Sequence, residues 1–262
     1  MEGLRLSTMF FSPTRTTKKV VKAIAKGTGL KPKVYDLTQE VDRDIRKKFF
    51  DKDELLIVGV PVYAGRVPEI LLEGFKKLKS DGAYFLPIVV YGNRAFEDAL
   101  IELVDIFEEN NFIKVGYGVF IGEHSYSKEI ATKRPDKADL EIAEKFGKEI
   151  IERIEKSDKR EELFTEEIPG NRPYRERIKR DEVWGPVASD KCTFCGTCIR
   201  NCPVDAIQHL NPKKTDYDKC IHCSACIKFC PENAKKNEGQ FFEMIRDRLL
   251  RDHRERKEVI VR

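Results

Sequence analysis

The sequence has little of several features, and each absence narrows what the protein can be. No cysteine lies outside residues 192–230, tryptophan occurs once, and no apolar run approaches the about 18 residues of a membrane-spanning helix. The formal net charge of +4 is too small to indicate a nucleic-acid partner by itself. The first residues show no basic leader followed by a long apolar stretch. We therefore expect a cytoplasmic protein, with no membrane insertion and no nucleic-acid partner.

The composition is that of a globular chain with a heavily charged surface. Charged residues make up 36% of the sequence and hydrophobic residues 40%. With 262 residues, the chain is long enough to form two domains, each with its own core.

The eight cysteines form two runs with the same spacing. One run reads C-T-F-C-G-T-C-I-R-N-C-P from Cys192, and the other reads C-I-H-C-S-A-C-I-K-F-C-P from Cys220, 28 residues later. The spacing C-x2-C-x2-C-x3-C-P is typical of bacterial proteins with two cubane iron–sulfur clusters, in which the fourth cysteine of each run ligates the other cluster. The spacing predicts two 4Fe–4S clusters, one held by Cys192, Cys195, Cys198 and Cys230, the other by Cys220, Cys223, Cys226 and Cys202.

Structural zinc and disulfides are the alternatives for these cysteines, and both fit less well. Zinc sites use two separated pairs of cysteine or histidine, whereas each run here has four cysteines within eleven residues. Reduced thiols also agree with a cytoplasmic location. His222 lies inside the second run, and we expect it at the surface rather than among the ligands, because four thiolates complete a cluster site.

Residues 1–157 alternate strand and helix patterns. Strands are predicted over 4–11, 33–37, 54–61, 83–91 and 116–121, and helices over 16–26, 70–78, 96–110 and 140–154. Five strands joined by helices predict right-handed crossovers and a doubly wound parallel five-stranded α/β sheet.

Three loops follow strands of this sheet at the edge where such folds bind ligands. The first, S-P-T-R-T-T, begins at Ser12 and opens a helix, so its hydroxyls and the free helix N–H groups can cradle a phosphate. The second, P-V-Y-A-G-R-V-P, begins at Pro61, and the third, Y-G-N-R, begins at Tyr91; each combines an aromatic side chain with glycine. An N-cap and ordinary turns are the alternatives for each loop taken alone.

These pieces resemble a known family. Residues 1–157 look like a flavodoxin, and nearly the whole chain resembles the flavodoxin–ferredoxin fusion proteins called EFR-family ferredoxins, on the three loops, G-E-H-S-Y-S after the fifth strand, and the two cysteine runs. The resemblance implies a flavodoxin-like sheet, a small α+β ferredoxin domain with two 4Fe–4S clusters, and FMN. Arg15 departs from the family, since many flavodoxins have glycine there, and a cation could strengthen phosphate binding or crowd it.

The FMN residues implied by the resemblance come from the three loops. In the phosphate loop they are Ser12, Thr14, Arg15, Thr16 and Thr17; in the loops around the ring they are Pro61, Val62, Tyr63, Ala64, Gly65, Tyr91, Gly92, Asn93 and Arg94.

The expected domains are a flavodoxin-like domain at 1–157, a linker at 158–188, a ferredoxin domain at 189–237 and a charged amphipathic helix at 238–262. The basic stretch 172–180 within the linker predicts a solvated segment, with a docking patch for an electron acceptor as the alternative. Trp184 is expected to pack the linker against a domain, and the C-terminal helix to pack on the protein, with a partner interface as its alternative.

Two functions fit this organisation. The favoured hypothesis is an electron carrier that relays electrons between FMN, the clusters and redox protein partners such as ferredoxin-type donors or acceptors. The alternative is an FMN-dependent oxidoreductase that reduces a small substrate, with His124, Ser125 and Tyr126 as proton donors. A third hypothesis is a flavodoxin-like domain that has lost flavin and serves only for docking.

Overall fold

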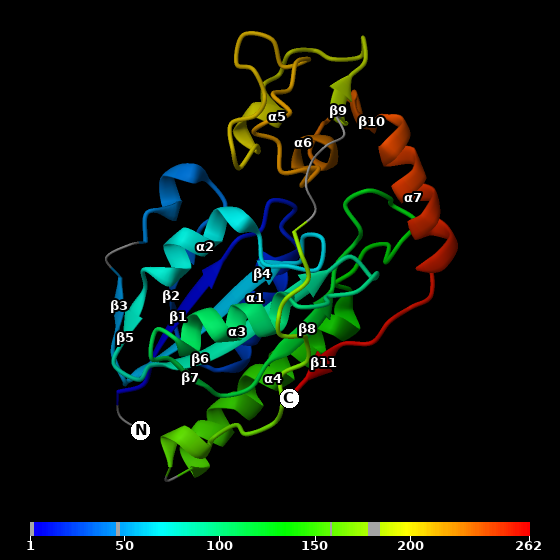
Figure 1. The fold of residues 1–262 in the computed structure, drawn as a ribbon. Helices are drawn as coiled ribbons and strands as arrows, with labels where there is room; N and C mark the ends of the chain where they lie inside the picture. Colours follow the sequence, from blue (N-terminus) through cyan, green and yellow to red (C-terminus); the bar gives the residue numbers. More distant parts are fainter. Residues whose placement is uncertain (1–2, 46–47, 158, 178–183) are drawn as a thin grey trace.

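The structure is a computed structural model that describes residues 3–45, 48–157, 159–177 and 184–262. Figure 1 shows a larger α/β part built on one twisted sheet and a small module above one end of that sheet. The small module contains both cysteine runs.

Five parallel strands form the main sheet, as predicted. They are β1 (Arg5–Phe10), β2 (Pro32–Asp36), β4 (Glu54–Pro61), β6 (Tyr84–Tyr91) and β8 (Gly118–Ile121). They lie in the spatial order β2-β1-β4-β6-β8. Numbered along the chain this is the order 2-1-3-4-5 of the flavodoxin-like doubly wound sheet, which binds ligands at the carboxyl ends of its strands. The predicted fold class is therefore confirmed.

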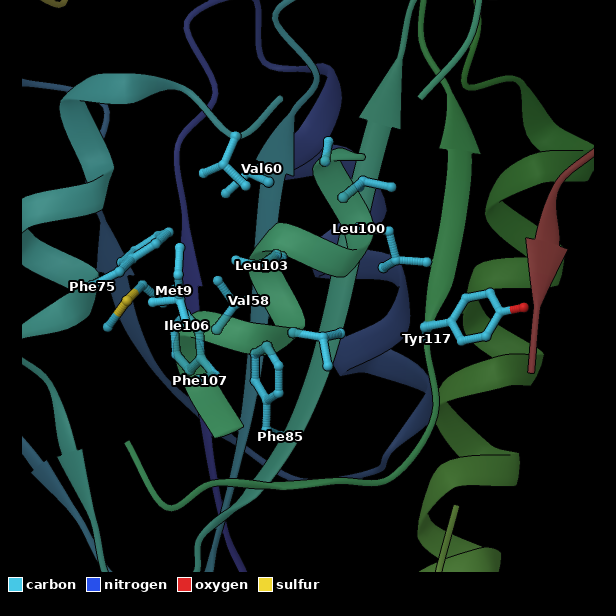
Figure 2. Close-up of a cluster of buried hydrophobic side chains, with 14 of the residues drawn as sticks. Met9, Val58, Val60, Phe75, Phe85, Leu100, Leu103, Ile106, Phe107 and Tyr117 are labelled. Carbon is cyan, nitrogen blue, oxygen red and sulfur yellow. The ribbon is translucent and has the colours of Figure 1, made fainter. Parts of the chain in front are cut away.

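Helices cover both faces of the sheet. On one face, α1 (Thr16–Gly27) and α4 (Lys137–Lys156) bury side chains against alternate strand residues such as Leu55 and Ile57. On the other face, α2 (Glu69–Lys76) and α3 (Ala99–Glu108) pack against the intervening strand residues, which include Val58 and Val60. Figure 2 shows this second core, where Phe85 of β6 stacks on Phe107 of α3 at 4.3 Å between ring centroids. Burial on both faces explains why the central strands are continuous apolar runs.

The sheet also gains short strands that the sequence analysis misses. The pair β7 (Ile113–Lys114) and β6 is parallel, and β11 (Ile260–Val261) pairs antiparallel with β8. Beside it, the N–H groups of Arg262 and Tyr117 each donate to the other residue's carbonyl at 3.1 Å. A separate small parallel pair joins β3 (Phe49–Phe50) to β5 (Lys79–Ser80), and a 3-10 turn spans Glu40–Arg43. The helix predicted over 238–262 therefore covers only α7 (Gln240–Asp252), after which the chain returns to the sheet (Figure 1).

Residues 158–188 are not one linker. Phe164 and Ile168, after a 3-10 turn at Arg160–Glu162, are buried in the same core as the side chains of α3. Strand β9 (Gly185–Ala188) instead pairs antiparallel with β10 (Lys235–Glu238) of the small module, so the module begins before residue 189. Residues 158 and 178–183 lie outside the described residues.

The described part of the basic stretch at 172–180 is partly solvated, since residues 172, 173 and 176 are exposed, but it is also bound to α3. Arg172 and Tyr174 both donate to the carboxylate of Asp105 on α3. Arg177 donates to Glu102, whose carboxylate is buried and also accepts from Arg66. These contacts hold the described part of the stretch to the flavodoxin-like domain, while its last residues lie outside the described residues.

The small module repeats one backbone twice. In each half a short helix, α5 (Thr197–Arg200) or α6 (Ala225–Lys228), starts directly after a residue in the left-handed conformation, Gly196 in one half and Ser224 in the other. Left-handed residues recur at the same 28-residue offset at Phe194 and His222. The repeat in the sequence is thus a repeat in the backbone.

Candidate cofactor sites

Cysteines from both runs converge on one cavity in the small module. Cys192, Cys195 and Cys198 line it together with Cys230 of the other run. The Sγ of Cys230 accepts a hydrogen bond from the N–H of Ala234 at 3.2 Å, and Cys195 is exposed. The cavity therefore brings together the four cysteines predicted for the first cluster.

The second set lies deeper. Cys220, Cys223 and Cys226 are all buried. Burial, together with the neighbouring thiolates of Cys220 and Cys202, raises the pKa of the Cys226 thiol to about 12. Burial likewise raises the pKa of Cys223, with Cys226 and Cys202 contributing. Thiols held neutral by burial and mutual repulsion are stabilised as thiolates when a cation binds, so this donor set fits an iron–sulfur cluster.

The two halves also support their crossing cysteines in the same way. The N–H of Ala206 donates to Cys202 Sγ at 3.2 Å, as Ala234 does to Cys230. Within the described residues, no group of His, Cys, Asp or Glu has the geometry that holds a single metal ion. A cluster separates its thiolates by a core of iron and sulfide, so this finding does not bear on cluster binding.

The phosphate loop lies at the start of α1. The Oγ of Ser12 accepts from the backbone N–H of Lys18 at 3.0 Å, and the hydroxyl oxygens of Thr14 and Thr16 are 3.2 Å apart. Thr17 is fully buried, and its Oγ1 has no hydrogen-bond partner among the described residues. An orphaned hydroxyl at the start of a helix, where the helix dipole favours negative charge, fits a phosphate.

Arg15 has a different role from its threonine neighbours. Its φ of 65° is left-handed, which explains why glycine suits this position. The Arg15 guanidinium lies over the ring of Phe229 at 4.3 Å and reaches Asn201 Oδ1 at 3.4 Å. Both residues belong to the small module, so the Arg15 side chain connects the two parts of the molecule.

The two ring loops lie side by side at the carboxyl ends of β4 and β6. The N–H of Val62 donates to the carbonyl of Val90 at 2.9 Å, which ties the loops together. Ala64 and Gly65 take left-handed conformations between Tyr63 and Arg66, whose backbones pair with each other. A Cβ on Gly92 would lie 2.6 Å from His124 Cδ2, so the loop after β8 closes on this edge and requires glycine here.

Several predicted flavin residues use their side chains elsewhere. Tyr91 is buried in the core against Phe96, at 5.8 Å between ring centroids. Arg94 makes a two-point ion pair with Glu97. The amide of Asn93 donates to the carbonyls of His253 and Glu255 in the C-terminal tail. The side chains of Tyr91 and Arg94 are therefore engaged within the loop region, whereas the buried Oδ1 of Asn93 has no hydrogen-bond partner among the described residues.

Tyr63 lies at the junction between the two parts. Its ring contacts Phe11 edge-on, and burial together with the nearby thiolates of Cys223 and Cys220 raises the pKa of its phenol well above the usual value. Ile221, between those two cysteines, packs against the core of the flavodoxin-like domain. The buried cysteine set thus faces the predicted flavin loop.

Four aromatic side chains close the same junction, and we call them the aromatic junction. They are Tyr126 from the loop after β8, Trp184, His222 and Phe242 of α7. Trp184 stacks on His222 at 4.0 Å, and His222 Nε2 lies 3.1 Å from the Trp184 carbonyl oxygen. His222 is therefore half-buried in this junction instead of lying on an open surface, and the packing role of Trp184 and of α7 is confirmed.

His124 lies between the aromatic junction and the ring loops. Its Nδ1 accepts from the N–H of Tyr126 at 3.1 Å. Burial, helped by the charges of Arg94 and His253, lowers the pKa of His124 to about 4. His124, a candidate proton donor from the sequence, is therefore neutral near pH 7 and lies against Gly92.

A known protein family is similar to the small module that contains the cysteines. Residues 191–235 match the family model of the 4Fe-4S dicluster domain, and this likeness together with the eight cysteines supports two 4Fe–4S clusters as cofactors. No curated protein matches the chain in sequence. No helix among the described residues is long and apolar enough to cross a membrane.

Solved structures are similar to the N-terminal part. The chain is 16% identical to a flavodoxin from the domain Archaea, covering 58% of this chain and 99% of that one at a TM-score of 0.40. It is also 16% identical to flavodoxin 1 from Bacillus cereus, covering 56% and 97% at a TM-score of 0.43. A flavodiiron core from Synechocystis is 16% identical, with 59% and 37% covered and a TM-score of 0.45. The strand order of the main sheet shows the fold of this part by itself.

Proposed function

We propose that the chain is an electron-transfer iron–sulfur flavoprotein that relays electrons between FMN, two 4Fe–4S clusters and an external redox protein. The observation that carries the proposal is the packing of Ile221, which lies between Cys220 and Cys223, against the same core as Tyr63 of the flavin loop. When bound, FMN exchanges electrons singly or in pairs, and each cluster exchanges one at a time.

The residues around the sites have distinct roles in this proposal. The hydroxyls of Ser12, Thr14, Thr16 and Thr17 hold the FMN phosphate at the start of α1. The backbones of residues 61–65 and 91–94 border the ring, and His124 closes one side of it. The two cysteine sets cross between the runs as the sequence predicts.

The arrangement gives the relay two different ends. Cys220, Cys223 and Cys226 are buried beside the flavodoxin-like domain, whereas Cys195 of the other set is exposed. An exposed cluster site is the one that a protein partner can approach. We therefore place exchange with the partner at Cys195 and exchange with FMN at the buried set.

The oxidoreductase alternative has less support. Its proton donors were His124, Ser125 and Tyr126, but a low pKa keeps His124 neutral near pH 7 and so a poor proton donor. Tyr126 packs its ring in the aromatic junction.

Anaerobic stopped-flow with the reduced protein separates the two functions. A relay predicts fast oxidation by a ferredoxin-type protein and slow oxidation by small quinones. The opposite order, with fast turnover of a quinone, would favour the oxidoreductase. Cys195→Ser, which alters only the exposed set, should slow oxidation by the ferredoxin-type protein without changing the flavin absorbance.

A further inference from the structure

A buried cation of the small module has no hydrogen-bond partner among the described residues. Lys235, the first residue of β10, is only 4% exposed, and its Nζ makes no hydrogen bond to any described residue. A buried ammonium without a partner is costly, because it loses its hydration without gaining an opposite charge. Its position therefore calls for an anion nearby.

The cavity that Lys235 lines indicates which anion this is. It forms part of the cavity wall that also contains Cys192, Cys195, Cys198 and Cys230. Cys198 in turn packs with Cys226 of the other set around Ile207, so the two cysteine sets meet here.

The internal repeat shows that this lysine is not required by the backbone. The position 28 residues earlier is Ile207, which is 2% exposed. The preceding residues, Ala206 and Ala234, are alike, buried, and donate to the crossing cysteines in the same way. One half of the repeat thus has an apolar side chain where the other has a charge.

We propose that Lys235 supplies a fixed positive charge to the two cluster sites and raises their reduction potentials. A cluster held by four thiolates is an anion, and reduction adds one electron and so one more negative charge. A nearby cation stabilises the reduced form more than the oxidised form, and net charge is one of the factors that set cluster potentials. The effect is larger for the site whose cavity Lys235 lines. The inference rests on the two clusters of the proposed function but not on FMN or on any partner.

The test is an EPR-monitored redox titration of the anaerobically purified protein, with dithionite as the reductant. Lys235→Met should lower the midpoint of at least one cluster by about 59 mV, a tenfold change in the ratio of reduced to oxidised cluster for a one-electron couple. Lys235→Arg, which keeps the charge, should retain the wild-type midpoints. Ile207→Met, a volume-conserving change at the equivalent buried position, is the matched control and should shift neither midpoint.

Unchanged midpoints in a Lys235→Met protein with full iron content would overturn the proposal, as would an equal shift in Lys235→Arg. Should Lys235→Met and Lys235→Gln both purify with less iron, retention of iron by Lys235→Arg would support the same charge acting at assembly. Loss of iron from Lys235→Arg as well would contradict it. Because potentials are read without a partner protein, a failure here is distinct from a failure of the relay.

Discussion

The two halves of the cysteine module share a backbone but differ in their surroundings. Phe194 and His222 are equivalent positions with φ near 58° and 56°, yet Phe194 is 55% exposed while His222 stacks on Trp184. Cys195 is exposed, whereas its equivalent Cys223 is buried beside Tyr63. A symmetric module has thus acquired an inner side, facing the flavodoxin-like domain, and an outer side, facing solvent.

Removing one cysteine ligand from the inner side and one from the outer side should give the largest difference between the two sides. Cys226→Ser is expected to remove the inner cluster, about four of the about eight irons, and with it electron exchange between FMN and the module. Cys195→Ser should also lower the iron content, but electrons from the reduced flavin should still reduce the inner cluster. Iron assay and EPR during anaerobic photoreduction of the flavin measure both effects, and identical behaviour of the two variants would contradict the assignment of sides.

The aromatic junction should matter far more for stability than its equivalent on the outer side. Trp184→Ala removes a buried ring that contacts His222, Phe242 and Tyr126, and we expect it to lower the free energy of unfolding by about 3 kcal/mol. Phe194→Ala, on the exposed outer side, should change it by less than about 0.5 kcal/mol. Thermal or denaturant unfolding of the loaded protein checks this, and equal losses would mean that the inner side is not held by its packing.

His124, which lies next to the aromatic junction, should also make the free energy of unfolding depend on pH. The pKa of His124 is lowered from 6.5 to about 4, so the unfolded chain binds this proton more readily than the folded protein does. Stability is then lost as the pH falls from about 6.5 toward 4, by about 1 kcal/mol between pH 7 and pH 5 once partial solvent screening is allowed for. The difference between wild type and His124→Gln isolates this contribution, and parallel stability curves for the two would disprove it.

Arg15 should give the smallest effect. Arg15→Ala loses the contact with Phe229 while keeping the left-handed backbone, a cost of about 0.5–1 kcal/mol. Arg15→Gly loses the same contact but relaxes the backbone, so its stability should lie closer to wild type. Limited proteolysis should cut between the two parts faster in both variants, and unchanged proteolysis would show that Arg15 does not hold them together.

The sequence predicted the site best where the spacing of residues along the chain defines it. The cysteine spacing is independent of what surrounds it, so the crossing of Cys202 and Cys230 could be inferred before the structure. The apolar strands of the main sheet were equally clear, because burial on both faces leaves a continuous pattern in runs such as Glu54–Pro61.

Long-range contacts could not be inferred in the same way. The strand Ile260–Val261 is too short to show a pattern, and it forms only because β8 offers an open edge. Tyr91 packs on Phe96, Asn93 donates to the C-terminal tail, and Arg94 pairs with Glu97. These contacts depend on how the folded chain is arranged in space, so the sequence pattern does not show them. Similarly, the charged Lys235 looks like any surface lysine until its burial is known.

The central claim is that one chain holds FMN and two clusters, and the content of the anaerobically purified protein tests it most directly. Iron, acid-labile sulfide and flavin should be found at about eight, about eight and about one per chain. Zinc in place of iron, about four irons or fewer, or the absence of FMN would contradict the account.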